Sequence, residues 1–106
     1  MKGSAARDRY LPMTESAFYI LVSCVESRHG YGIMQHVEGL TDGRVTLAPG
    51  TLYGTLSKME KDRLIGLASV EETRKIYQIT SLGAEILDEE ITRIRELYRN
   101  TKGIEL

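Results

Sequence analysis

The chain has 106 residues, of which 42% are hydrophobic and 27% are charged. This length fits one domain, and the composition is typical of a folded globular protein, which excludes a disordered or fibrous chain. The formal net charge of −1 excludes attraction of polyanions by overall charge, although cations gather locally in residues 1–9 and 44–63.

Residues 1–12 are interpreted as an N-terminal arm, which leads into no hydrophobic segment of a secretory signal. The first helix is expected at residues 14–27, with Thr14 as N-cap. Most of its faces are apolar, so it should lie centrally in the core, with Cys24 as a packing residue. Cys24 is the only cysteine and the apolar run 17–25 is shorter than the roughly 20 residues that span a bilayer, so we expect a cytoplasmic protein.

A second, short helix is expected after the glycine-rich stretch RHGYG, residues 28–32. Ile33, Met34 and Val37 have the spacing of its buried face. A turn around Asp42-Gly43 then separates this helix from the next.

The third helix is expected to start at Pro49, a residue that suits the first helical position. At about 100° per residue, Leu52, Leu56 and Met59 lie within about 40° of one line, which we interpret as the buried side. The opposite side is low and polar, with Gly50, Gly54, Ser57 and Lys61 at its centre and Thr51, Lys58, Tyr53 and Glu60 at its edges.

Gly54 poses a question, because a glycine inside a helix costs about 1 kcal/mol relative to alanine. One explanation is that another element of the same chain packs closely there. The other is that this side enters a DNA major groove, where Lys58, Lys61 and the hydroxyls of Thr51, Tyr53 and Ser57 contact phosphates or bases.

The hydrophobic period then changes, and residues 67–70 and 76–79 are predicted to form a β-hairpin around the connection EETRK. Tyr77 and Ile79 fall on one face, with Ile76 and Gln78 on the other, so one face should be buried. Arg74 and Lys75 near the tip either reach DNA as a wing or belong to a solvated turn.

A long last helix is expected from Thr80 or Ser81 to about Arg99. Its apolar positions step by 4, 3 and 4, the spacing of a seam against another helix, and they are Leu87, Ile91, Ile94 and Tyr98. A small domain has little else to place on such a seam, so we expect a homodimer that presents two recognition helices to half-sites about one DNA turn apart.

Three helices, a hairpin and a long helix predict a mainly α fold with a β-hairpin (α+β). We interpret residues 13–80 as a winged helix-turn-helix DNA-binding domain and residues 81–106 as a C-terminal dimerisation helix.

Three stretches resemble the signature blocks of PadR-like transcriptional regulators: HGYGIMQHVE at 29–38, LAPGTLYGTLSKMEKDRLI at 47–65 and RKIYQITSLG at 74–83. The resemblance runs from about residue 13 to residue 99, and the P-G-T-L-Y-G-x-L run is highly specific. It implies a homodimeric DNA-binding regulator, usually a repressor that leaves a palindromic operator when a small hydrophobic or aromatic compound binds. With one C-terminal helix the chain is similar to short-tailed members, and with no Trp it offers an aromatic effector few stacking partners.

By position, the resemblance also implies roles for individual residues. Tyr31 and Gly32 match a helix start whose N–H groups hold a phosphate, and Arg74 and Lys75 match the basic end of the wing. The matches to the recognition helix are Gly50, Thr51, Tyr53, Gly54, Ser57 and Lys58.

Catalysis and metal binding are not supported by the sequence. Cys24, His29 and His36 are the only soft or borderline ligands, and they follow no metal-site spacing. No phosphate-binding loop or nucleophile motif is present either, so we expect no cofactor and no enzyme activity. The remaining alternative is a winged-helix protein–protein interaction module without direct DNA binding, which a weak salt dependence would reveal.

Overall fold

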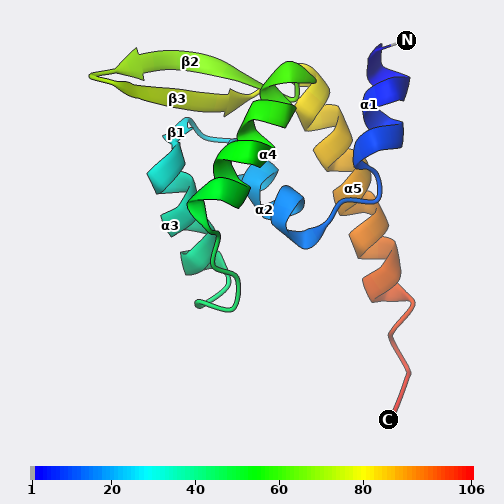
Figure 1. The fold of residues 1–106 in the computed structure, drawn as a ribbon. Coiled ribbons are helices and arrows are strands. Elements are labelled where there is room, and N and C mark those ends of the chain that lie inside the picture. Colours follow the sequence, from blue (N-terminus) through cyan, green and yellow to red (C-terminus); the bar gives the residue numbers. More distant parts are fainter. Residues whose placement is uncertain (1) are drawn as a thin grey trace.

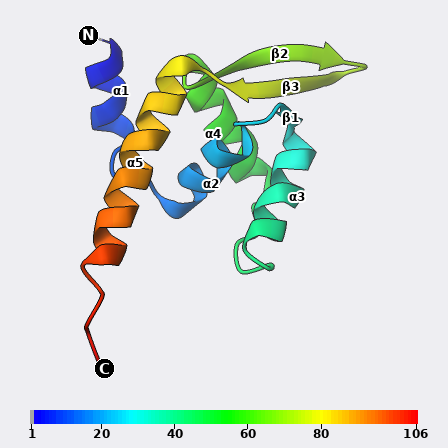
Figure 2. The ribbon, with the colours of Figure 1, turned by 180° about the vertical axis from the view of Figure 1, so that it is seen from behind.

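The computed structural model describes residues 2–106, with side chains from Ala5 onward. In this range it contains five helices and three strands. In chain order they are α1 (Lys2–Tyr10), α2 (Glu15–Ser23), β1 (Arg28–His29), α3 (Gly30–Leu40), α4 (Pro49–Lys61), β2 (Ile65–Glu71), β3 (Arg74–Ile79) and α5 (Ser81–Arg99). α1 and α5 lie together at one side of the molecule, and the β2–β3 hairpin projects from the other side (Figures 1 and 2). None of the described helices combines the length and apolar composition that a bilayer crossing requires.

Helix α2 is the centre of the core, as predicted. The Thr14 hydroxyl accepts a hydrogen bond from the Ala17 N–H at 3.2 Å, which confirms the N-cap, and Cys24 is fully buried. The helix ends at Ser23 and not at residue 27, because the carbonyl of Cys24 accepts a hydrogen bond from the Ile79 N–H at 2.7 Å. That carbonyl is therefore used by β3, and the chain turns there into β1.

Helix α1 was not expected, since the sequence placed the first helix after residue 13. It is fixed by tertiary contacts: Ala6 and Tyr10 are buried in the core, and the Tyr10 hydroxyl donates to Asp62 Oδ2 at 2.8 Å. Arg7 binds Glu89 of α5 at 2.9 Å. Two buried side chains are too few to produce a recognisable period.

The hairpin belongs to a three-stranded antiparallel sheet of order β1-β3-β2. The two-residue strand β1 was missed, because it exists only through its pairing with β3, in which Arg28 lies opposite Tyr77 and His29 opposite Ile76. The expectation of one buried face was wrong, because Ile76 and Tyr77 are both buried. They lie on the central strand, flanked on both edges, where the register with β2 also shifts between Leu67 and Ser69.

Helix α5 begins as predicted, with Thr80 as N-cap accepting from the Gly83 N–H at 3.1 Å. Gly83 is required here, because a Cβ at this position would collide with the backbone oxygen of Leu64. The same oxygen accepts a hydrogen bond from the Thr80 N–H at 3.0 Å. The start of α5 is thus packed directly onto the chain that enters β2.

The predicted seam of α5 is divided by the fold. Leu87 is 6% exposed and Ile91 packs against the core, because α1 and α2 both contact α5. Ile94 and Tyr98, in contrast, are 37% and 67% exposed. Leu87 and Ile91 are therefore occupied within the chain, and only the C-terminal half of the seam is open to a partner.

Glu90 on α5 is buried and holds the connection between α1 and α2. One carboxylate oxygen accepts from the Met13 N–H at 3.0 Å, and Arg93 binds both oxygens at 2.7 and 2.9 Å. These hydrogen bonds, that of Arg93 first, lower the pKa of Glu90 against the opposing effect of burial. In the sequence, only the spacing of three residues between Glu90 and Arg93 indicates this pair.

Candidate nucleic-acid interface

Helix α4 has the two sides that the sequence predicted. Pro49 occupies its first turn, and Leu52, Leu56 and Met59 are buried. The predicted contact residues on the opposite side are all exposed, and they are Gly50, Thr51, Tyr53, Gly54, Ser57, Lys58 and Lys61.

The surface around Gly54 is open. Among the described residues, no heavy atom lies within 4 Å of a Cβ built at Gly50 or Gly54, outside the helix itself. Packing of another described element on Gly54 is therefore excluded. The middle of α4 presents its backbone to the outside as a low strip.

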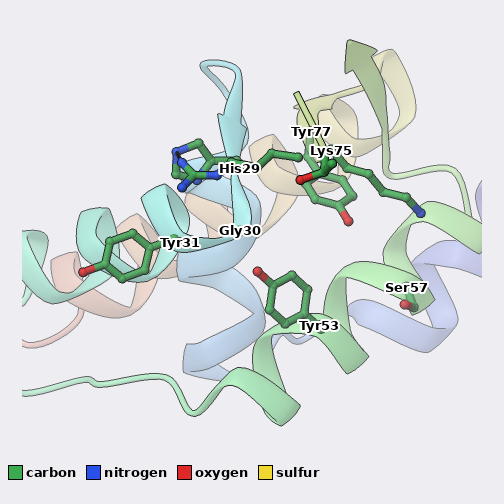
Figure 3. A pocket seen from close by; sticks show the side chains of 9 residues that line it. His29, Gly30, Tyr31, Tyr53, Ser57, Lys75 and Tyr77 are labelled. Carbon is green, nitrogen blue, oxygen red and sulfur yellow. Dashed lines mark hydrogen bonds between the residues drawn. The ribbon is translucent and has the colours of Figure 1, made fainter. Parts of the chain in front are cut away.

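A hollow of about 450 Å³ lies beside this strip, between α4, the start of α3 and the wing (Figure 3). Every side chain in its wall carries a polar group, and the complete lining is His29, Gly30, Tyr31, Tyr53, Ser57, Thr73, Arg74, Lys75 and Tyr77. Five predicted DNA-binding residues from three separate segments thus share one concave surface. Burial, and after it the nearby Glu60, raises the pKa of the Tyr77 phenol.

Two predicted lysines lie at the other end of α4, away from this hollow. Lys58 Nζ is 5.8 Å from the centre of the Tyr10 ring. Lys61 lines a separate hollow with Arg9, Asp62 and Arg63. The predicted contact residues therefore extend beyond the hollow, as far as the side of α4 that faces α1.

The backbone donor expected at Gly32 is already used. Its N–H donates to Nδ1 of His29 at 3.0 Å, and this hydrogen bond caps α3. The Gly32 N–H is therefore not free for the expected phosphate contact, whereas the side chain of Tyr31 is exposed. From the sequence, His29 is considered only as a possible metal ligand, and its capping role is not predicted.

Gly30 provides the space for the Tyr53 side chain. A Cβ at Gly30 would lie 2.5 Å from the Tyr53 hydroxyl oxygen and 2.7 Å from its Cε1 atom. The ring of Tyr53 extends from α4 towards the backbone where α3 begins (Figure 3), while the residue stays about half exposed. Gly30 therefore sets where the Tyr53 hydroxyl lies in the hollow, a relationship that only the structure reveals.

Comparison with known proteins identifies the type of chain. The model of the family "Transcriptional regulator PadR-like family" matches residues 20–89. The transcriptional regulator YqjI of Escherichia coli is 28% identical over 103 residues, which cover 96% of this chain and 50% of the relative. The chain thus spans about half the length of this curated relative.

Two solved structures share both fold and sequence features. A transcriptional regulator from Clostridium thermocellum superimposes with a TM-score of 0.71 at 25% identity, over 84% of this chain and 92% of the other. A PadR-like transcriptional regulator from Bacillus cereus superimposes with a TM-score of 0.64 at 26% identity, over 85% and 93%. These similarities confirm the predicted winged-helix fold class.

Proposed function

The chain belongs to the PadR-like family of transcriptional regulators, and from this premise we propose that it is a homodimeric repressor that binds a palindromic operator in double-stranded DNA. Family membership confirms the resemblance seen in the sequence. It also confirms that the chain is not an enzyme, because the family consists of transcriptional regulators. The DNA contacts, the dimer, the repressor role and the effector are the content of the proposal.

The observation that carries DNA binding is the open side of α4. Gly54 has no neighbour within the described chain, so α4 can approach a surface as closely as its backbone allows. A major groove about 12 Å wide admits such a helix, with the hydroxyls of Thr51 and Ser57 near base edges and phosphates. Lys58 and Lys61 continue the contact as phosphate-binding cations.

The wing supports the same placement. Arg74 and Lys75 are exposed on β3 and line the hollow that Tyr31 and Tyr53 share. A DNA backbone that passes α4 would cross this hollow, because the wing and α4 border it from two sides. Glu71 and Glu72 at the tip limit the net positive charge, so we expect moderate and strongly salt-dependent affinity.

The proposed dimer uses the C-terminal half of α5. Ile94, Leu97 and Tyr98 are exposed there, and this half of the helix extends beyond α1 and α2 (Figure 1). Leu87 and Ile91 belong to the proposed dimerisation helix, but they pack against the core of their own subunit and are not proposed to contact the partner. We place the DNA-binding domain at residues 13–80 and dimerisation at 81–106, with α1 in the arm of residues 1–12.

A small hydrophobic or aromatic effector is proposed to bind near this interface. Support comes from a hollow of about 350 Å³ between α2 and α5, lined by Met13, Phe18, Tyr19, Ile94 and polar groups. A panel of planar hydrophobic compounds should change tyrosine fluorescence and lower DNA affinity. If no compound in the panel changes either, the effector part of the proposal is wrong.

The central test is a mobility-shift titration against the DNA upstream of the protein's own gene, at two salt concentrations. We expect binding of the cytoplasmic dimer that weakens steeply with salt, as phosphate contacts release counterions. The alternative, a winged-helix module that binds only proteins, predicts no preference for duplex DNA. A folded dimer without duplex binding at low salt would refute the proposal.

A further inference from the structure

The hydrogen bonds of His29 assign its ring proton to Nε2. Its Nδ1 accepts the Gly32 N–H at 3.0 Å and so caps helix α3. A ring nitrogen that accepts a hydrogen bond has no proton, and in a neutral imidazole the other nitrogen then carries it. The capping contact therefore makes Nε2 a hydrogen-bond donor.

This donor faces a second donor. Arg74 Nη1 lies 3.4 Å from His29 Nε2, and a guanidinium group has no acceptor atom. Within the described chain, Arg74 makes no salt bridge with a carboxylate that would satisfy it. Two N–H donors thus point to the same small region, and no protein acceptor joins them.

The pairing of strands creates this juxtaposition. β1 pairs with β3 through His29 opposite Ile76, which brings the start of α3 against the base of the wing. Both side chains line the hollow, and Lys75 and Tyr31 line it as well. The region is therefore surrounded by donors from two elements that are far apart in the sequence.

We infer that one oxygen of a DNA backbone phosphate binds between His29 Nε2 and Arg74, so that His29 is a phosphate-binding residue. This inference rests on the proposed function. A phosphate oxygen accepts several hydrogen bonds at once, and guanidinium–phosphate contacts are charge-assisted. The phosphate oxygen accepts hydrogen bonds from both donors, which otherwise face each other. The hydrogen bond that caps α3 holds His29 in the tautomer that can donate from Nε2 to this oxygen.

The test distinguishes the capping role of His29 Nδ1 from the proposed phosphate contact of His29 Nε2. His29→Asn keeps a good N-cap for α3 but lacks the Nε2–H, so its unfolding midpoint should equal that of the wild type. Duplex affinity should fall about tenfold, as expected for loss of a hydrogen bond to a charged group. The slope of log affinity against log salt should not change, because a neutral donor releases no counterion.

Arg74→Gln should also lower affinity about tenfold, and it should flatten the salt slope by about one. In the double variant the two losses should be less than multiplicative, because both groups bind the same oxygen. Arg44→Gln removes an exposed arginine that pairs with Glu15 of α2 and lies outside the proposed DNA contacts and the dimerisation helix. It serves as the charge-matched control and should change neither quantity. Duplexes with single neutral methylphosphonate linkages then locate the phosphate: at one position the substitution should weaken the wild type but not the double variant.

The outcomes are distinct. If the wild type does not bind duplex DNA, the proposed function fails and the inference fails with it. If the wild type binds DNA and His29→Asn binds equally well, or if the two losses simply multiply, only the inference is wrong. Inorganic phosphate that shifts the His29 NMR signals at millimolar concentration, together with unchanged DNA affinity of His29→Asn, would assign the position to free phosphate and overturn the DNA contact.

Discussion

Replacement of Gly54 should stabilise the protein and weaken its DNA binding. Gly54 lies inside α4, and a Cβ there meets no heavy atom of the described chain within 4 Å outside the helix itself. Gly54→Ala should therefore raise the free energy of unfolding by about 0.5–1 kcal/mol through backbone entropy alone. For a domain of this size, that corresponds to a rise of about 2–8 °C in the unfolding midpoint. Gly54→Met should give a comparable gain, since its side chain meets only solvent.

The same substitutions separate folding from binding. A methionine on the open strip of α4 holds the helix away from the groove, so duplex affinity should fall by at least about tenfold, or about 1.4 kcal/mol. Gly39→Ala in α3 is the matched control, because Gly39 is exposed and also has no neighbour within 4 Å among the described residues. Circular dichroism melts and mobility shifts measure the two effects. A Gly54→Met protein that binds DNA like the wild type, or one that is destabilised, would refute the reasoning.

Three further substitutions test contacts inside the chain. Gly83→Ala should lower the unfolding free energy by about 2–4 kcal/mol, seen in urea melts, because its methyl group meets a backbone carbonyl that cannot move freely. Glu90→Gln should lower the free energy of unfolding by about 1–2 kcal/mol at neutral pH. Arg93 lowers the pKa of Glu90 in the folded protein, so the stabilisation by the ionised carboxylate is complete above the usual carboxyl range and is lost as the pH falls through the lowered value. Melts of wild type and variant should therefore converge in acid. Gly30→Ala should displace the Tyr53 ring and lower duplex affinity severalfold, but it should have little effect in a Tyr53→Ala background, a coupling that a double-mutant cycle measures.

The sequence was most informative where a single element decides its own structure. Helix α4 could be predicted in both position and orientation, because Pro49 marks its start and three buried side chains repeat at the helical period. The N-caps Thr14 and Thr80 were identified for the same reason, since each hydroxyl accepts from an N–H three residues later. Local chemistry is sufficient for such features.

Features that depend on contacts across the fold could not be predicted in this way. Strand β1 needs β3 as its partner, and α1 is held by Asp62 and Glu89 from distant elements. His29 is another example, because neither its cap on Gly32 nor its approach to Arg74 follows from a motif. In each case the partner is brought close only by the complete chain, so the residue alone gives no signal.

The glycines show how this limit also helps to locate the interface. Gly30 and Gly83 each leave room for a neighbour within the chain, a tyrosine side chain in one case and a backbone carbonyl in the other. Gly54 destabilises its helix by about 1 kcal/mol relative to alanine, but no atom of the described chain outside the helix occupies the space beside it. Gly39 also has no neighbour among the described residues, but only Gly54 lies among the exposed side chains of Thr51, Ser57 and Lys61. We therefore propose that the neighbour of Gly54 is a partner molecule on that side. A partner with donors and acceptors at the bottom of a groove and charge along its edges fits that side, and duplex DNA has both.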